Sequence, residues 1–171
     1  MYIMNTYIAT FNLTRLALES SSDLVIPSDY FNRQGLFIIS NNGNLKRIEI
    51  GNNTFGSVWL FELNGLSELQ SVEIGEKSFN GGRNDGGCRI TNCPKLKSIR
   101  IGDDSFSHYS STFELTNLPC LQSVDIGAST FLHASLSLTG MIGLMMISRS
   151  SSTTISQTGW WRILVLSFGC V

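Results

Sequence analysis

The stretch 45–55, LKRIEIGNNTF, decides the fold, because its pattern returns at nearly regular intervals along the chain. In numbered form the pattern is Leu45-x-x-Ile48-x-Ile50-Gly51-x-x-Thr54-Phe55. Its counterparts are LQSVEIGEKSF at 69–79, LKSIRIGDDSF at 96–106 and LQSVDIGASTF at 121–131, with a weaker copy from Leu24 to Phe31. The last isoleucine of the copies stands at positions 26, 50, 74, 101 and 126, so the steps are 24, 24, 27 and 25 residues. A repeat of this length predicts a solenoid in which each copy forms one turn.

A second apolar motif lies between successive copies of the first. One example is Phe61-x-Leu63-x-Gly65-Leu66, and related motifs begin at Phe37, Cys88, Phe113 and Leu136. In both motifs apolar and polar residues alternate, which is typical of a strand with one buried face. We therefore expect two short strands per turn that face each other across a thin core. The Ser/Thr-Phe pair is expected to form a corner whose ring fills that core.

Two positions of the repeat predict backbone geometry. The position after the second strand is always Gly or Asn, at Asn41, Gly65, Asn92, Asn117 and Gly140. These two residue types tolerate a positive φ, so we expect a left-handed turn there. The position after the first strand is Pro27 in one copy and glycine in the other four. Because proline fixes a negative φ, glycine at this position is expected to serve close packing instead.

Copies of about 24 residues with the pattern Leu-x-x-Ile-x-Ile match the leucine-rich repeat, whose period is about 20–29 residues. With Ile-Gly or Ile-Pro after the strand and Ser/Thr-Phe at the corner, the chain resembles the BspA-like subclass of bacterial surface antigens and many protist proteins. The resemblance covers residues 21–147 and implies a mostly-β leucine-rich-repeat solenoid of about five turns of 24–27 residues, with two short parallel strands per turn. It also implies a scaffold for binding surfaces, a role compatible with many partners.

The repeat register fails near the carboxyl end of the chain. The next copy would need an apolar residue at Arg149 and an aromatic one at Thr154. We therefore divide the chain into an N-terminal remnant or cap at 1–20, the solenoid at 21–147, and an irregular Ser/Thr-rich linker with an apolar tail at 148–171. The last segment is either an improvised terminal cap or the sign of a truncated or partly mistranslated piece of a longer array.

Composition narrows the classes of function. Apolar residues make up 42% of the 171 residues, charged residues 15%, and the formal net charge is -1 without a block of one sign. Nucleic acid is therefore not the expected partner, since its binders carry a basic patch. The apolar tail Trp160–Val171 contains Arg162 and is shorter than the about 20 residues that span a bilayer, so we expect no transmembrane segment. No signal peptide is seen at 1–13, which slightly favours an intracellular location.

The four cysteines are expected to be free thiols. Cys88 and Cys93 replace residues that are Phe or Leu in other copies, so we expect them to fill the core rather than to form a disulfide or a metal site. Cys120 aligns with charged residues of other copies and is therefore expected at the surface, and Cys170 lies in the tail. Free thiols fit an intracellular compartment.

No motif indicates catalysis or a cofactor. The two histidines, His108 and His133, both follow a corner phenylalanine and are expected in solvent-exposed loops. Nucleophile-elbow, phosphate-loop and zinc-protease motifs are not found. In the glycine-rich loop 80–87, Asn84 and Asp85 are too few oxygen ligands for calcium, so we expect a plain edge loop in contact with solvent or a partner. We expect a protein that is not an enzyme, without catalytic residues, cofactor or metal.

The outward residues between the apolar residues of each strand are the candidate binding residues. Stacking places one set in a column on the first strands, namely Glu49, Glu73, Arg100 and Asp125. A second column on the second strands contains Glu62, Arg89 and Glu114. With rungs about 4.8 Å apart, each column forms a charged ladder. The ladders are either solvated faces that keep the protein soluble or a recognition surface of mixed charge for a protein or peptide.

Our main hypothesis is a non-enzymatic protein–protein interaction module on a leucine-rich-repeat scaffold. The alternative is a self-assembling surface or adhesion protein, with association through the solenoid ends or Trp160–Val171, or a fragment of a longer repeat array. A hydrolase, a third possibility on a parallel solenoid, would need carboxylates clustered in a groove. The sequence spreads them one per rung.

Overall fold

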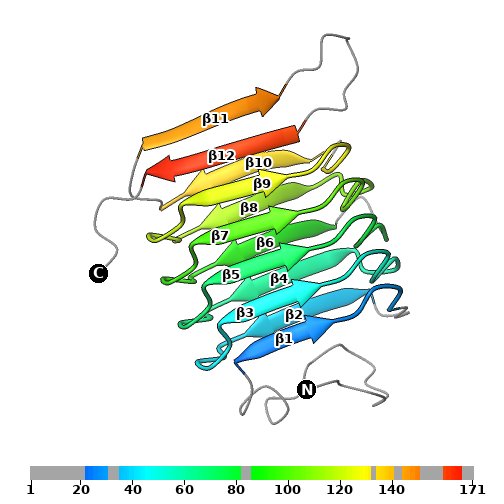
Figure 1. Cartoon of the computed structure of the whole chain (residues 1–171), viewed down its shortest axis with the longest axis horizontal. Coiled ribbons are helices and arrows are strands. Elements are labelled where there is room, and N and C mark those ends of the chain that lie inside the picture. The colour runs from blue at the N-terminus through cyan, green and yellow to red at the C-terminus, as the bar shows by residue number, and fades with distance from the viewer. Residues whose placement is uncertain are drawn as a thin grey trace.

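The fold is a mostly-β solenoid of stacked strands (Figure 1). The computed structural model describes residues 22–30, 35–81, 86–131 and 134–140, together with the strand residues 144–150 and 160–166. In this part of the chain there are twelve strands and no helix. The expected N-terminal remnant or cap at 1–20 lies outside the described residues.

Two parallel sheets face each other in the solenoid. The first contains β1 (Asp23–Ile26), β3 (Arg47–Ile50), β5 (Ser71–Ile74), β7 (Ser98–Ile101) and β9 (Ser123–Ile126). The second consists of β2 (Leu36–Ser40), β4 (Leu60–Asn64), β6 (Gly87–Thr91), β8 (Thr112–Thr116) and β10 (Ser135–Thr139). Equivalent residues of successive copies pair in register, as Ile48 does with Val72 and Phe37 with Phe61. The predicted solenoid with two short parallel strands per turn is confirmed.

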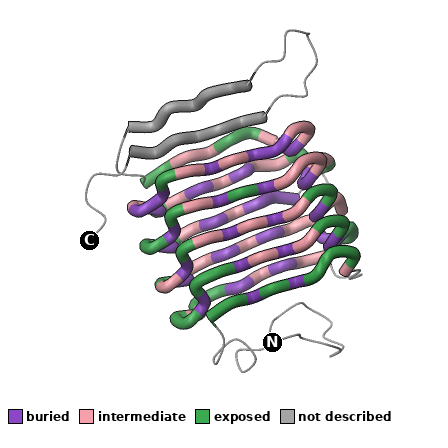
Figure 2. Tube along the Cα trace, in the orientation of Figure 1, coloured by how far each residue is buried: buried purple, intermediate pink, exposed green. Residues whose placement is uncertain are grey.

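The core lies between the two sheets and is built from their inward side chains. In β1–β5 and β7–β9 buried residues alternate with half-buried or exposed ones, as Figure 2 shows and as Phe61, Glu62 and Leu63 illustrate. The corner phenylalanines form a continuous stack, with ring centroids 5.0 Å apart for Phe55–Phe79 and 4.9 Å for Phe79–Phe106. The corner rings therefore fill the core as predicted, and their stacking adds aromatic pair energy to the burial of apolar surface.

The backbone at these corners is left-handed, which the sequence did not lead us to expect. Phe55, Phe79, Phe106 and Phe131 have φ values between 51° and 57°. This region is sparsely populated by residues with a side chain and costs of order 1–3 kcal/mol per residue. The buried ring stack offsets that cost, because a fully buried apolar side chain of this size contributes about 1.5–3 kcal/mol.

A ladder of buried hydroxyl groups accompanies the ring stack. The residue before each corner phenylalanine is Thr54, Ser78, Ser105 or Thr130, and all four are buried. The Ser78 hydroxyl donates a hydrogen bond to the Gly51 carbonyl at 3.0 Å and accepts one from the Thr54 amide at 3.2 Å. The ladder thereby satisfies backbone groups that the left-handed corners leave without a strand partner.

Both predictions about the glycine positions are confirmed. The Gly or Asn position after the second strand has φ between 54° and 67° in all five copies. The glycines after the first strand are not among the positive-φ residues of the described chain. They lie instead against the preceding turn, since a Cβ at Gly75 would be only 2.7 Å from the backbone nitrogen of Asn52.

The carboxyl end departs from parallel stacking. Strand β12 (Trp160–Leu166) pairs antiparallel with β9, and β11 (Leu144–Ser150) pairs antiparallel with β12. We expected an irregular segment at 148–171, but 148–150 and 160–166 are strand residues. The reason is the open edge of β9, whose amide and carbonyl groups offer an apolar segment a ready template for pairing. The backbone of this hairpin agrees with the alternative of an improvised cap.

The described cysteines are of two kinds. Cys88 and Cys93 are free and buried, as predicted, and burial raises the pKa of both thiols. Cys120 is only 7% exposed and is disulfide-bonded. The prediction of an exposed free thiol at Cys120 is therefore wrong, because alignment with the charged residues of other copies does not reveal that this sulfur forms a disulfide. Cys170 lies outside the described residues.

One buried side chain links turns that are not neighbours. The Tyr109 hydroxyl donates a hydrogen bond to the Val58 carbonyl at 2.9 Å, across 51 residues of sequence. The Tyr109 ring packs edge-on against Phe106 at 5.0 Å. Burial raises the pKa of Tyr109 well above its usual value, so the hydroxyl stays a donor. Tyr109 thus ties the turn of Phe106 to that of Phe55 across the turn between them.

Candidate partner-binding groove

The structure brings the first predicted set of binding residues into one column. The strand register pairs Glu49 with Glu73, Glu73 with Arg100, and Arg100 with Asp125. Each lies between two buried strand residues and therefore on the outer face of the sheet. The backbone register continues the column to Arg162 of β12. The predicted ladder therefore exists as a geometric feature.

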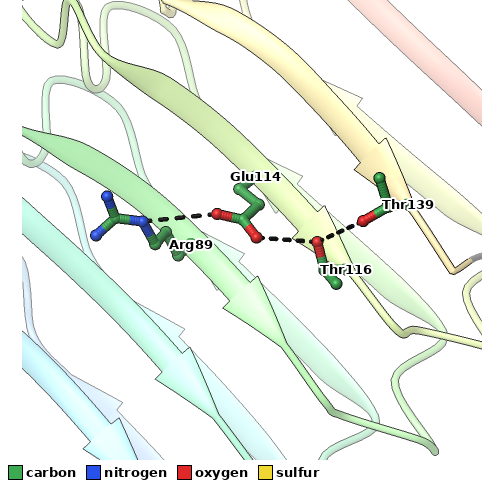
Figure 3. A network of polar contacts seen from close by, with 4 residues as sticks. All are labelled: Arg89, Glu114, Thr116 and Thr139. Atoms are coloured by element: carbon green, nitrogen blue, oxygen red, sulfur yellow. Dashed lines mark hydrogen bonds and ion pairs between the residues drawn. The ribbon is translucent and has the colours of Figure 1, made fainter.

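The second predicted set lies on the other sheet, so the two ladders do not form one surface. Glu62, Arg89 and Glu114 are also partners in the register. Figure 3 shows that Arg89 reaches Glu114, with Nε 3.6 Å from Oε2, and that Thr116 donates to Oε1 at 3.0 Å. The Thr116 hydroxyl in turn lies 2.9 Å from that of Thr139. Many polar side chains of this ladder thus interact with side chains on the neighbouring strands of the same sheet.

A groove runs along the first ladder, at the carboxyl ends of its strands. The groove has a volume of about 350 Å³ and is lined by residues from successive turns. Gly51, Gly75 and Gly102 contribute to its lining. Because glycine has no side chain, the column of glycines leaves a depression between the outward residues of the strands and those of the following corner. Close packing of the turns therefore also creates the groove.

Sequence reasoning missed the second wall of the groove. Asn52, Glu76 and Asp103 follow the glycines of three successive turns and line the groove opposite the ladder. Asn52 Oδ1 accepts a hydrogen bond from the Glu76 amide at 2.9 Å, and Asp103 Oδ1 accepts one from the Ala128 amide at 3.0 Å. These bonds fix the orientation of the two side chains. The signal in the sequence was the fixed position after Ile-Gly, which repeats as regularly as the strand residues do.

The groove is more acidic than the ladder alone. Its lining includes the five carboxylates of Glu49, Glu73, Glu76, Asp103 and Asp125 and one cationic side chain, Arg100. Arg100 lies 3.9 Å from Glu73. Arg47, beside the groove, pairs with Glu49 at 2.6 Å. Both pairs are solvent-exposed and contribute only about 0–1 kcal/mol each. Along each wall there is at most one carboxylate per rung, in line with the expectation. Because the two walls line the same groove, their carboxylates nevertheless lie together.

The described His, Cys, Asp and Glu side chains bear on whether the protein could hold a metal ion. No group of three or more His, Cys, Asp or Glu side chains in the described ranges is arranged to hold a metal ion. His108 is exposed, as expected, and its Nδ1 lies 3.1 Å from the Asn80 carbonyl oxygen. His133, Asn84 and Asp85 lie outside the described residues. None of the described segments is a helix long and apolar enough to cross a membrane.

The fold and the groove define a parallel β-solenoid repeat protein with an acidic groove along one edge of its first sheet. Comparison with protein-family models, with curated proteins and with solved structures found no match. The groove and the stacking of the turns therefore carry the functional inference.

Proposed function

We propose that this chain is a non-enzymatic leucine-rich-repeat interaction module of the BspA-like type, whose groove binds an extended, positively charged segment of a protein partner. The observation that carries the proposal is the lining of the groove, where five carboxylates face one arginine. Complementary charge steers the encounter with a partner and selects its register. The same charge repels phosphate backbones, in line with the expectation that nucleic acid is not the partner.

The dimensions of the groove suit a short extended peptide. Its lining runs from Ser28 to Asp125 and therefore covers four steps from turn to turn. At about 4.8 Å per step the groove is about 19 Å long, which matches about six residues of extended chain at about 3.3 Å each. A basic peptide that lies along the solenoid axis can thus meet a carboxylate at nearly every rung.

Partner binding agrees with the exposure of the carboxylates better than hydrolysis does. A general acid is usually kept protonated by an apolar, buried setting. The side chains of Glu49 and Glu73 are 39% and 47% exposed, respectively. Such groups remain well solvated and interact with a ligand mainly as fixed charges. The proposal accordingly assigns them to recognition, without a catalytic role.

The expected affinity is modest and depends on salt. Each exposed carboxylate contributes about 0–1 kcal/mol to binding a cation. Salt screens exposed charges over about 8–10 Å at physiological ionic strength. A hexalysine peptide should therefore bind weakly, and more tightly at low salt.

The test measures fluorescence anisotropy of a labelled hexalysine peptide at low salt. The groove variant carries Glu73→Gln and Glu76→Gln. The matched control carries Glu62→Gln and Glu114→Gln, which remove the same charge from the other sheet. We expect the groove variant to bind about fivefold more weakly, from about 0.5 kcal/mol per carboxylate, and the control to bind nearly as the wild type does.

Equal losses of peptide affinity in the two variants would show that the peptide is attracted by the net charge of the protein and not by the groove. Circular dichroism of each variant verifies that the fold is intact. Wild-type protein that does not bind the peptide at low salt would refute the proposed partner chemistry.

A further inference from the structure

The carboxyl end of the solenoid is a step rather than a flat face. The first sheet continues beyond β9 by two strands, β12 and then β11, whereas the second sheet ends at β10 (Figure 1). With strands about 4.8 Å apart, the hairpin rises about 10 Å above the edge of the second sheet. The end of the molecule therefore has a low half, formed by β10, and a high half, formed by β11.

The low half leaves part of the core open. Leu136 belongs to the inward column of Phe37, Phe61, Cys88 and Phe113, all of which are buried. Leu136 itself is 40% exposed. On the high half, by contrast, Val124 and Ile126 of β9 are buried. The apolar end of the second sheet is thus open, while the apolar end of the first is covered.

Strand β10 also lacks the usual protection of an edge strand. Exposed edges are normally blunted by charged residues, by proline or by a bulge, because free amide and carbonyl groups invite another strand. The sequence of β10 is SLSLT, without charge or proline. In the described sheet it pairs with β8 alone. An apolar, uncharged edge of this kind is suited to pairing with a further strand.

Among the described residues, the first rung at the amino-terminal end is not open in the same way. Leu24, Ile26, Phe37 and Ile39 form the first rung, and all four are buried. Head-to-tail stacking of copies would need this rung to be open, as the rung at Leu136 is. An end-to-end contact between copies is therefore expected to join two carboxyl ends.

We propose that two copies of this chain associate through their carboxyl ends, with β10 of each copy pairing antiparallel with β11 of the other. A twofold axis parallel to the strands places the low half of one step over the high half of the other. Since both steps have a height of two strands, they interlock without a gap. The arrangement is isologous and closed, so it gives a dimer and not a fibre.

The strand directions agree with this pairing. Because the chain coils, each strand of the second sheet runs back against the strand of the first sheet before it. Two antiparallel pairings in succession, β9 with β12 and β12 with β11, give β11 the direction of β9. A twofold axis along the strands preserves that direction. The β11 strand of the second copy thus runs opposite to β10, as antiparallel pairing requires.

The area is sufficient for a weak but specific dimer. Sheets about 10 Å apart with outward side chains, and strands about 17 Å long, give an end face of about 340 Å². The wall of the step adds about 160 Å² for each copy. Together the two copies bury about 1,000 Å², close to the lower limit for a biological interface.

The test is sedimentation velocity of the full chain over about two decades of protein concentration. The wild type should shift from monomer to dimer and no further. Leu136→Lys places a charge in each low half and should weaken dimerisation at least about tenfold. The matched control is Val25→Lys, since Val25 is 46% exposed at the opposite end of the solenoid, and it should dimerise as the wild type does.

Hydrogen–deuterium exchange of the wild type gives a second measurement that needs no variant. Amides of β10 and β11 should exchange more slowly at high protein concentration, while those of β1 should not change. A wild type that stays monomeric, a Leu136→Lys variant that still dimerises, or open-ended growth beyond the dimer would each overturn the proposal. If Leu136→Lys does not fold, concentration-independent exchange in β10 overturns it instead.

Discussion

Replacing Ser78 by alanine removes one rung of the buried hydroxyl ladder and should be among the most destabilising small changes in the protein. The Ser78 hydroxyl accepts a hydrogen bond from the Thr54 amide at 3.2 Å and from the Thr54 hydroxyl at 3.1 Å. It donates to the Gly51 carbonyl at 3.0 Å. Alanine leaves the buried Thr54 amide without an acceptor, whereas the Thr54 hydroxyl can direct its single proton to the Gly51 carbonyl, which lies 3.1 Å away.

The loss of stability is estimated from the one buried amide that is left without a partner and the hydroxyl hydrogen bond that is lost. A buried donor that loses its partner costs about 1–3 kcal/mol, and a lost hydroxyl hydrogen bond adds about 0.5–1.5 kcal/mol. We expect Ser78→Ala to lower the free energy of unfolding by about 2–3 kcal/mol, measured by urea unfolding followed by circular dichroism. The midpoint temperature of thermal unfolding should fall by about 4–12 °C for a chain of this size.

Ser78→Thr is the matched control for this prediction. Threonine occupies the equivalent position at Thr54 and Thr130, so the hydroxyl is retained in a geometry that the corner accepts. The variant should unfold within about 0.5 kcal/mol of the wild type. The reasoning is refuted if Ser78→Ala is as stable as the wild type, or if threonine destabilises the protein as much as alanine does.

Three further outcomes are expected. Gly75→Ala should strongly destabilise the solenoid, because its Cβ would meet the Asn52 amide nitrogen at 2.7 Å, whereas Gly56→Ala, with nothing within 4 Å, should be nearly neutral in the same urea titration. Tyr109→Phe should cost about 1–3 kcal/mol, since it leaves the Val58 carbonyl without its donor, and an unchanged unfolding midpoint would contradict that role. Burial raises the pKa of the Cys88 thiol above the value of 9.0 for a free thiol. The unfolded chain therefore ionises first, so stability should fall as pH rises above about 9, and Cys88→Ala should reduce that slope.

The regular part of the fold could be predicted from the sequence because period and packing agree there. The alternation around Ile48 and Ile50 fixes which residues point inward, and the repeat steps fix which residues are neighbours across strands. The column of Glu49, Glu73 and Arg100 follows from these two facts alone. Prediction of such a column needs no knowledge of side-chain conformation.

Features that depend on contacts between turns, or on a strained backbone offset by packing, could not be predicted from the repeat pattern. The left-handed backbone at Phe55 contradicts the local preference of phenylalanine and is stabilised by the ring stack, the hydroxyl ladder and a backbone hydrogen bond to Tyr30. Glu76 and Asp103 occupy positions that vary in residue type, so their shared wall becomes visible only when the turns are stacked. The strand at Trp160–Leu166 depends on pairing with β9, which lies outside its own segment, and the bonded state of Cys120 leaves no trace in its repeat position.

The hydrogen bond from Tyr109 to Val58 bears on how the solenoid opens. In a stack of repeats each turn usually contacts only its two neighbours, so the ends can fray one turn at a time. A bond that reaches over a whole turn couples second neighbours as well. The middle turn cannot detach while the phenol holds the turns on both sides of it. The three central turns should therefore open as one cooperative unit and exchange their amide hydrogens together, while fraying is confined to the ends.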